Sequence, residues 1–197
     1  MEVNIKVNLS GLILDNPVIP ASGTYGFGKE YVDFYDINIL GSISIKGTTV
    51  QRRKGNPQPR IAECYSGLIN SVGLENPGMD NVIQKELKDL ETIYRKPVIA
   101  NISGFSVEEY VTLAREMDQV DNVGIIEVNI SCPNVDHGGL AFGTNADNVR
   151  ELTKKIKEVT TKPIYMKLSP NVTDIKEIAR AAEEGGADGI SLINTLM

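Results

Sequence analysis

The chain has 197 residues, 41% of them apolar and 23% charged, a composition typical of one globular domain or two small ones. Its 26 acidic and 20 basic residues give a net charge of −6, which argues against binding to nucleic-acid phosphates. No apolar run approaches the roughly 20 residues needed to span a bilayer, and the N-terminal segment lacks a secretory-signal pattern. We therefore expect neither a nucleic-acid nor a membrane partner.

The cysteine and histidine content restricts the chemistry further. The chain has two cysteines, Cys64 and Cys132, and one histidine, His137. Two cysteines do not make a disulfide framework, so we expect a reducing, cytoplasmic setting. Zinc needs about four ligands, and this set does not supply them, so we expect no metal site.

The first elements in chain order are strand-like. Residues 3–15 (VNIKVNLSGLILD) alternate and predict a small hairpin that turns near Ser10 and Gly11 and closes the floor of a barrel. Residues Thr49–Met79 are too long for a βα link and are rich in turn formers, which predicts an ordered functional loop. Short runs rich in β-branched residues predict six strands, several of them apolar as in parallel sheets: Asn16–Gly23, Gly41–Thr49, Lys96–Gly104, Gly124–Cys132, Lys162–Pro170 and Asp188–Thr195.

Helical patterns separate the later strands. Ser106 and Glu109 have the spacing of a capping box, which predicts a helix that begins there. Apolar residues recur at spacings of three and four within 148–159, which predicts a helix with one buried face. A similar stripe runs from Ile175 to Ala182, and the glycine pair at 185–186 ends it.

This alternation predicts an α/β protein with parallel βαβ units, either a doubly wound sheet or a (β/α)8 TIM barrel. No G-x-G-x-x-G fingerprint follows a strand, which disfavours a dinucleotide-binding doubly wound sheet. Polar residues also recur where strands end, and a barrel gathers such ends on its active-site face. These residues are Ser22, Lys46, Asn101, Asn129, Lys167 and Asn194.

A closed barrel needs eight units in about 250 residues, but this chain stops just after the sixth predicted strand. We therefore expect one domain over residues 1–197 that supplies about six βα units plus the hairpin. The expected truncation removes two units at the C-terminus.

Cys132 lies in VNISCPNVDHGG, directly after an apolar strand and before Pro133. A free cysteine is commonly an inert core residue, but its position where a barrel strand opens into a loop favours a functional thiol. Such a thiol acts as a nucleophile beside a histidine or as a general base next to a carbonyl. His137 is near in sequence, although loop packing explains it equally well. We treat Cys64 as structural or incidental.

Two lysines and several asparagines extend the candidate site. Lys46 and Lys167 each lie late in an apolar strand, where a lysine needs a partner, so they indicate an anionic ligand or a salt bridge across the barrel mouth. Asparagine donates and accepts at once, which suits a heterocycle with amide-like edges. The glycine-rich run PASGTYGFG (Pro20–Gly28) allows close approach to a flat cofactor but has low specificity.

The motifs SIKGTT, NSVGLENPG, NISCPNVDHGGLAFGT, MKLSPN and SLINT occur in this order. In these motifs and across the whole chain, the sequence resembles the dihydroorotate dehydrogenase family, most closely its class 1B, the NAD-linked bacterial type. The resemblance implies a TIM barrel that holds FMN and oxidises dihydroorotate to orotate in pyrimidine biosynthesis. It also implies a partner subunit with FAD and a [2Fe–2S] cluster that passes electrons to NAD, and a homodimer of catalytic chains within a heterotetramer.

The same resemblance assigns residue roles. Cys132 is implied to be the base that takes the C5 proton, and residues 133–144 to close over the substrate. Residues implied to bind substrate are Lys46, Asn70, Ser71, Val72, Gly73, Leu74, Asn129, Asn194 and Thr195. Residues implied to contact FMN are Ser22, Lys46, Gly47, Asn101, Asn129, Lys167 and Ile193, with the Lys167 ammonium near the N1/O2 edge.

Other interpretations stay open at this point. A related FMN barrel acting on another pyrimidine would share the asparagine set. The family holds the FMN phosphate after strands seven and eight, so an inactive truncated remnant that only binds a partner is a further alternative. The electron acceptor is NAD or fumarate.

Overall fold

The computed structural model describes residues 3–131 and 142–196. The chain opens with an antiparallel hairpin of β1 (Val7–Leu9) and β2 (Leu12–Leu14), as predicted. Its turn residues Ser10 and Gly11 both have positive φ (49° and 96°), the conformation that two-residue hairpin turns favour.

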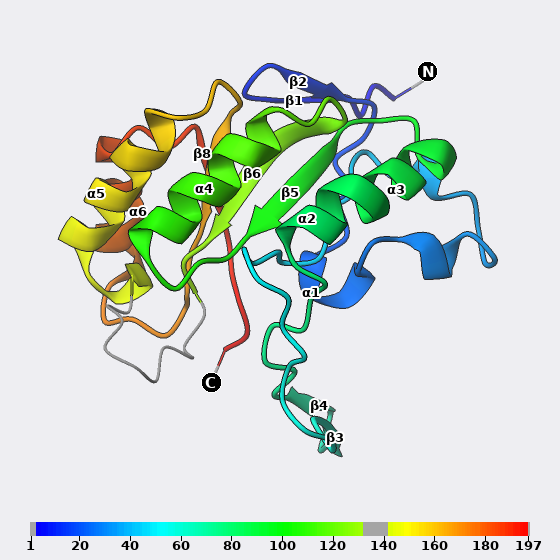
Figure 1. Ribbon diagram of the computed structural model, residues 1–197, viewed down its shortest axis with the longest axis horizontal. Coiled ribbons are helices and arrows are strands. Elements are labelled where there is room, and N and C mark those ends of the chain that lie inside the picture. The colour runs from blue at the N-terminus through cyan, green and yellow to red at the C-terminus, as the bar shows by residue number, and fades with distance from the viewer. Residues whose placement is uncertain (1–2, 132–141, 197) are drawn as a thin grey trace.

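The hairpin lies against the amino-terminal ends of the central strands, at the top of the molecule in Figure 1. The Ser10 hydroxyl is 3.1 Å from the hydroxyl of Tyr165 and donates to the carbonyl of Asp188, also at 3.1 Å. The Leu12 side chain packs over Gly124 at the start of the second central strand. The predicted position at the barrel floor is confirmed.

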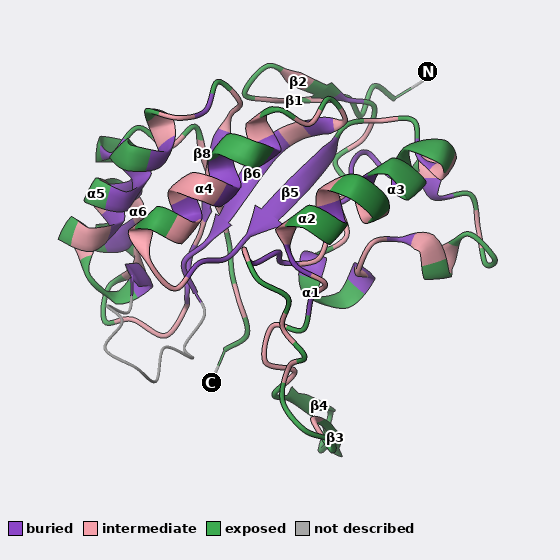
Figure 2. Ribbon diagram, viewed as in Figure 1, coloured by how far each residue is buried: buried purple, intermediate pink, exposed green. Residues whose placement is uncertain are grey.

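The central sheet is parallel, with strand order β5 (Val98–Ile102), β6 (Val123–Asn129), β7 (Ile164–Lys167) and β8 (Gly189–Ser191). All of β5 and nearly all of β6 is buried, as strands covered on both faces should be. Figure 2 shows β5 and β6 almost entirely in the buried colour. Four of the six predicted strands are therefore confirmed.

The second predicted strand in chain order, Gly41–Thr49, is extended along β5 without becoming a regular strand. Two parallel bridges, Ser44 to Ile99 and Thr48 to Ile102, connect it to the sheet. The Ile45 amide donates to Ile99 at 3.0 Å, and the Thr48 amide donates to Asn101 at 2.9 Å. The segment thus takes a strand's place beside β5 with an interrupted ladder.

The prediction of a strand at Asn16–Gly23 was wrong. Pro17 and Pro20 have no N–H to donate to a ladder, and within the described residues the segment forms no strand, although the Gly41 amide donates to the Val18 carbonyl. A short helix, α1 (Ser22–Tyr25), ends it. Two 3-10 turns, η1 (Lys29–Tyr31) and η2 (Ile37–Ile39), lead to the segment beside β5.

Residues Thr49–Met79 form an arm that projects from the end of the sheet opposite the hairpin (Figure 1). The tip of the arm is a second hairpin, β3 (Ile61–Cys64) and β4 (Gly67–Asn70), with every residue exposed. The predicted ordered loop therefore has secondary structure of its own. Cys64, at this tip, is free and exposed rather than packed.

Helices cover the sheet. The first is built from α2 (Met79–Asn81), the π-helical turn η3 (Val82–Glu86) and α3 (Leu87–Ile93). The next, α4 (Val107–Asp118), packs on β5 and β6, and α5 (Ala146–Lys157) packs between α4 and α6 (Ile175–Glu184). A 3-10 turn, η4 (Phe142–Thr144), precedes α5.

The predicted capping residues and apolar periodicity determine where these helices begin and which face of each is buried. The Ser106 hydroxyl accepts from the Glu109 amide at 3.2 Å, and the Glu109 carboxylate accepts from the Phe105 amide at 2.7 Å. The inner face of α4 buries large side chains such as Leu113 and Met117 completely, each worth about 1.5–3 kcal/mol of transfer free energy. The three predicted helices, one from its capping box and two from periodicity, are confirmed.

Candidate functional site

The predicted polar residues gather where the parallel strands end. Asn101 is near the end of β5, and Asn129 and Lys167 are the last residues of β6 and β7, in register with each other. Asn194 follows β8, and its backbone N–H donates to the Leu168 carbonyl at 3.2 Å. The shared end of the sheet brings these side chains together from four different units.

Lys46 lies at the same end, on the extended segment beside β5, and its amide donates to Gly26 at 2.9 Å. Burial lowers the pKa of its half-buried ammonium, and Glu75, which acts to raise this pKa, is itself paired with Arg60. Within residues 3–131 and 142–196, neither Lys46 nor Lys167 donates a side-chain hydrogen bond or forms an ion pair. The predicted salt bridge across the mouth is thus not seen there, which leaves an anion as the better partner for Lys46.

Asn129 and Asn194 are joined through Ser131. The Asn194 amide nitrogen donates to the Ser131 hydroxyl at 2.6 Å, and that hydroxyl donates to Asn129 Oδ1 at 2.5 Å. Ser131 and Asn129 are both buried. These two hydrogen bonds fix the side-chain amides of two residues that were predicted to bind a ligand. Ser131, which links them, was not identified from the sequence.

Glu127 is a second functional candidate that the sequence analysis missed. It is in register with Asn101, and its Oε2 accepts from Asn101 Nδ2 at 2.6 Å and from the Ser44 hydroxyl at 3.1 Å. The signal was available: a glutamate inside the apolar run GIIEVN is rarely buried without a partner.

Two buried oxygens near Gly47 have no hydrogen-bond partner in the described part of the chain. They are Asn101 Oδ1 and the Ser103 hydroxyl. A Cβ added to Gly47 would lie 2.8 Å from the first and 3.6 Å from the second, so glycine keeps this space open. Because buried polar atoms are normally satisfied, the arrangement fits a polar ligand such as a flavin that supplies the missing partners.

The predicted substrate segment 70–74 is only partly brought to this cluster. The Leu74 side chain reaches within 3.0 Å of a Cβ built on Gly47. In contrast, the exposed Asn70 pairs with Ile61 at the tip of the arm, and the Ser71 amide donates to Arg60. Val72 and Gly73 likewise contact the outgoing segment of the arm, at Asn56.

Asn76 anchors the returning end of the arm and was also missed. Its buried side chain accepts from the amides of Thr49 and Gly78 at 3.1 and 3.0 Å, and it donates to the Leu74 carbonyl at 2.9 Å. The side chain therefore links the start of the arm to its end and holds Leu74 near Gly47.

The remaining predicted site residues differ in how far they are buried. Ser22 is buried at the start of α1, whereas Ile193 and Thr195 are exposed after β8. Cys132 and the loop residues up to 141, including His137, lie outside the described residues. No group of His, Cys, Asp and Glu in the described ranges could hold a metal ion.

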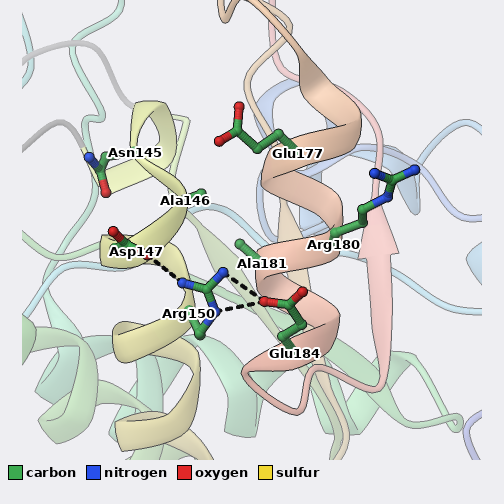
Figure 3. Close-up of a pocket in the computed structure, with 8 residues that line it drawn as sticks. All are labelled: Asn145, Ala146, Asp147, Arg150, Glu177, Arg180, Ala181 and Glu184. Atoms are coloured by element: carbon green, nitrogen blue, oxygen red, sulfur yellow. Dashed lines mark hydrogen bonds and ion pairs between the residues drawn. The ribbon is translucent and has the colours of Figure 1, made fainter.

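A polar depression lies away from the strand ends, between α5 and α6 (Figure 3). Arg150 spans it and pairs with Asp147 and Glu184 at 2.5 and 2.6 Å. These contacts neutralise the arginine and hold the two helices together. The ion pairs in this depression therefore stabilise the packing of α5 on α6. The depression is separate from the polar residues at the strand ends.

Parallel βα units are combined here with linked amides, and with lysines and buried oxygens that have no partner among the described residues. This combination is typical of a (β/α)-barrel protein with a site for a polar, anionic ligand. The chain belongs to the dihydroorotate dehydrogenase family, whose model matches residues 4–197.

Curated relatives agree with this membership. The chain is 55% identical to the catalytic subunit of dihydroorotate dehydrogenase B (NAD(+)) from Bacillus cytotoxicus over 193 residues, which is 98% of this chain and 62% of that protein. It is 54% identical to the proteins of the same name from Halalkalibacterium halodurans and Enterococcus faecalis. The chain thus spans 62–63% of the length of these relatives.

A solved structure supports the fold. The dihydroorotate dehydrogenase of Eimeria tenella, in complex with ferulenol, superposes with a TM-score of 0.76 at 20% identity, covering 98% of this chain and 60% of that one. The predicted α/β fold of the TIM-barrel type is thereby confirmed for the part of the barrel that this chain forms.

Proposed function

We propose that the protein carrying this chain oxidises (S)-dihydroorotate to orotate with FMN, as the NAD-linked class 1B dihydroorotate dehydrogenase of pyrimidine biosynthesis. The observation that carries the proposal is 54–55% identity to catalytic subunits of that name over nearly the whole chain. Lys46 is half-buried and has no partner among the described residues, and the orphaned oxygens lie near the next residue, Gly47. Both features support the proposal, because they suit an anionic substrate next to a polar cofactor.

The roles of the chain's own residues follow from their chemistry. Lys46 binds the substrate carboxylate, and Asn129 and Asn194, fixed through Ser131, bind the amide edges of the ring together with Thr195 and residues 70–74. The Cys132 thiolate takes the proton from C5 as the C5–C6 double bond forms. FMN, when bound, supplies the two-electron acceptor for the hydride from C6.

Five further residues complete the proposed cofactor contacts: Ser22, Gly47, Asn101, Lys167 and Ile193. The Lys167 ammonium, half-buried at the end of β7, stabilises negative charge on the reduced ring. Residues 1–197 form a single domain in this proposal, and residues 133–144 exclude water from the reacting atoms.

The electron route and assembly belong to the same proposal. The name of the relatives marks them as catalytic subunits of an NAD(+)-linked enzyme, which implies a second kind of subunit. We infer that this partner carries FAD and a [2Fe–2S] cluster, that the catalytic chains pair as a homodimer within a heterotetramer, and that the enzyme works in the cytoplasm. No helix in the described ranges is long and apolar enough to cross a membrane.

The test is a flavin spectrum of the purified whole protein. We expect visible absorbance from FMN that bleaches anaerobically on addition of dihydroorotate and returns on addition of the partner subunit and NAD. The matched variant Cys132→Ser should keep the spectrum and bleach at least about a hundredfold more slowly, because it lacks an effective base. A protein with no affinity for FMN, or one that dihydroorotate does not reduce, would overturn the proposal.

A further inference from the structure

Glu127 is a buried carboxylate whose environment calls for a functional explanation. It is 8% exposed within β6, and in the described ranges no lysine, arginine or histidine forms an ion pair with it. Removing a carboxylate from water without a cation is costly, so an apolar strand would not carry one for packing alone. The position is better explained by the hydrogen bonds that the carboxylate accepts.

Those hydrogen bonds come from two neighbouring segments. Asn101 Nδ2 on β5 donates to Glu127 Oε2 at 2.6 Å, and the Ser44 hydroxyl on the segment beyond β5 donates to the same oxygen at 3.1 Å. Asn101 is completely buried, and Ser44 is nearly so. A charged acceptor makes these bonds stronger than those between neutral groups.

The carboxylate also decides which way the Asn101 amide faces. A carboxylate only accepts hydrogen bonds, so the amide must direct its nitrogen to Glu127 and its oxygen away. The oxygen then lies in the space beside Gly47, buried and without a partner in the described part of the chain. A site that presents a buried, unsatisfied acceptor selects a ligand with an N–H or O–H donor.

We propose that Glu127 is a positioning residue, which locks the Asn101 carboxamide so that its oxygen accepts a hydrogen bond from the bound cofactor. The inference rests on the proposed function, in which that cofactor is FMN. The oxidised flavin ring has one N–H and the ribityl chain has hydroxyls, so FMN has suitable donors. Without Glu127 the amide is free to turn over and present its NH2 group, which such a donor cannot use.

The test is a double-mutant cycle on FMN affinity in the whole protein, with the dissociation constant measured by titrating apoprotein with flavin. We expect Glu127→Ala to weaken FMN binding about tenfold and to shift the visible spectrum of the bound flavin. Glu127→Gln retains an oxygen that accepts from the same two donors, so it should weaken binding about two- to threefold. In an Asn101→Ala background, either change should alter the dissociation constant by less than about twofold.

Ser42→Ala is the matched control. Ser42 is fully buried on the same segment as Ser44, but its hydroxyl donates to Pro97 and has no link to Asn101. We expect its FMN affinity to equal that of the wild type. The cycle separates a positioning role from a structural one, because general damage to the sheet would weaken binding equally in both Asn101 backgrounds.

Each outcome decides the question. Wild-type affinity in Glu127→Ala, or an equal loss in the Asn101→Ala background, overturns the positioning role while leaving the proposed function intact. A wild-type protein that binds no FMN overturns the proposed function and the positioning role with it. If Glu127→Ala does not fold, the double-mutant cycle is completed with Glu127→Gln, measured with Asn101 present and in the Asn101→Ala background.

Discussion

The side-chain amide of Asn194 donates a hydrogen bond of 2.6 Å to the hydroxyl of Ser131, across 63 residues of sequence. Ser131 follows β6 and Asn194 follows β8, and the same hydroxyl holds Asn129. Two side-chain amides at one end of the sheet are thus linked by a single side chain. Preorganisation of this kind reduces the entropy lost when a ligand binds.

Replacing Ser131 by alanine tests this link. We expect the KM for dihydroorotate to rise about five- to tenfold and kcat to fall less than about threefold, because the change loosens amides that we propose bind the substrate, without removing a reacting group. Steady-state kinetics with a saturating electron acceptor measure both constants. The control is Ser169→Ala, in a buried serine after β7 whose hydroxyl accepts from the Asn171 amide. An unchanged KM in Ser131→Ala would show that the two amides are held by other contacts.

Lys46 provides a prediction about charge. We expect Lys46→Ala to weaken the binding of orotate about ten- to a hundredfold, since a hydrogen bond to a charged group contributes about 1.5–3 kcal/mol. Equilibrium titration of orotate, followed by its effect on the flavin spectrum, measures the change. Lys54→Ala removes an exposed lysine from the start of the arm and should bind orotate normally. Equal affinities for wild type and Lys46→Ala would remove Lys46 from the substrate site.

The pH dependence of orotate binding follows from the same lysine. Burial lowers the pKa of Lys46 in the free protein, and a bound anion stabilises the charged form. Binding should therefore weaken as pH rises through the lowered pKa, at a pH below the 10.5 of an ordinary lysine. Titrations between neutral and alkaline pH measure the effect, and Lys46→Ala is the control, which should lose this dependence. A wild-type affinity that stays constant to pH 10 would contradict the assignment.

Local sequence patterns predicted the elements that local chemistry controls. The capping residues of α4, the stripes of α5 and α6, and the Ser10–Gly11 turn all use residues close together in the chain. Residues 16–23 resemble a strand locally because Val18 and Ile19 are β-branched, but Pro17 and Pro20 flank them. The prolines prevent a strand because they cannot donate the backbone hydrogen bonds that pairing with a neighbouring strand requires.

The polar residues at the strand ends were predictable as a set, but the hydrogen bonds that link them were not. The contact between Glu127 and Asn101 depends on the register of β6 against β5, and that between Ser131 and Asn194 depends on strands that are not neighbours in the sheet. No local pattern encodes either relationship. The same holds for the arm. In the sequence Asn76 is typical of a turn, and only the structure shows that its side chain binds Thr49, 27 residues away.

Asn76 gives a prediction about stability and about the arm. We expect Asn76→Ala to lower the free energy of unfolding by about 2–3 kcal/mol, because it leaves buried backbone groups of Thr49 and Gly78 and a partly buried carbonyl of Leu74 without partners. Chemical denaturation measures the loss, and Asn81→Ala, at an exposed site in α2, should change it by less than about 0.5 kcal/mol. A loss in Asn76→Ala as small as in the control would mean that the arm is held elsewhere.

Asp118 at the end of α4 connects that helix to the loop before β7, and it makes stability depend on pH. Burial acts to raise the pKa of its carboxyl, but hydrogen bonds from the Thr160 hydroxyl and from the amides of Lys162 and Thr161 outweigh burial and hold the pKa below 3.8. A carboxyl with a pKa that is lower in the folded than in the unfolded state stabilises the fold above its unfolded pKa. That stabilisation is lost as pH falls through the folded pKa.

We therefore expect Asp118→Ala to lower the free energy of unfolding by about 1–3 kcal/mol at pH 7, and by progressively less as the pH falls below about 4. Denaturation curves for both proteins at pH 7 and at several acidic values measure the difference. Glu116→Ala, at an exposed position two residues earlier, is the matched control and should have little effect at either end of the range. A difference between wild type and Asp118→Ala that stays constant from pH 7 to pH 3 would show that the carboxylate charge is not what holds the loop.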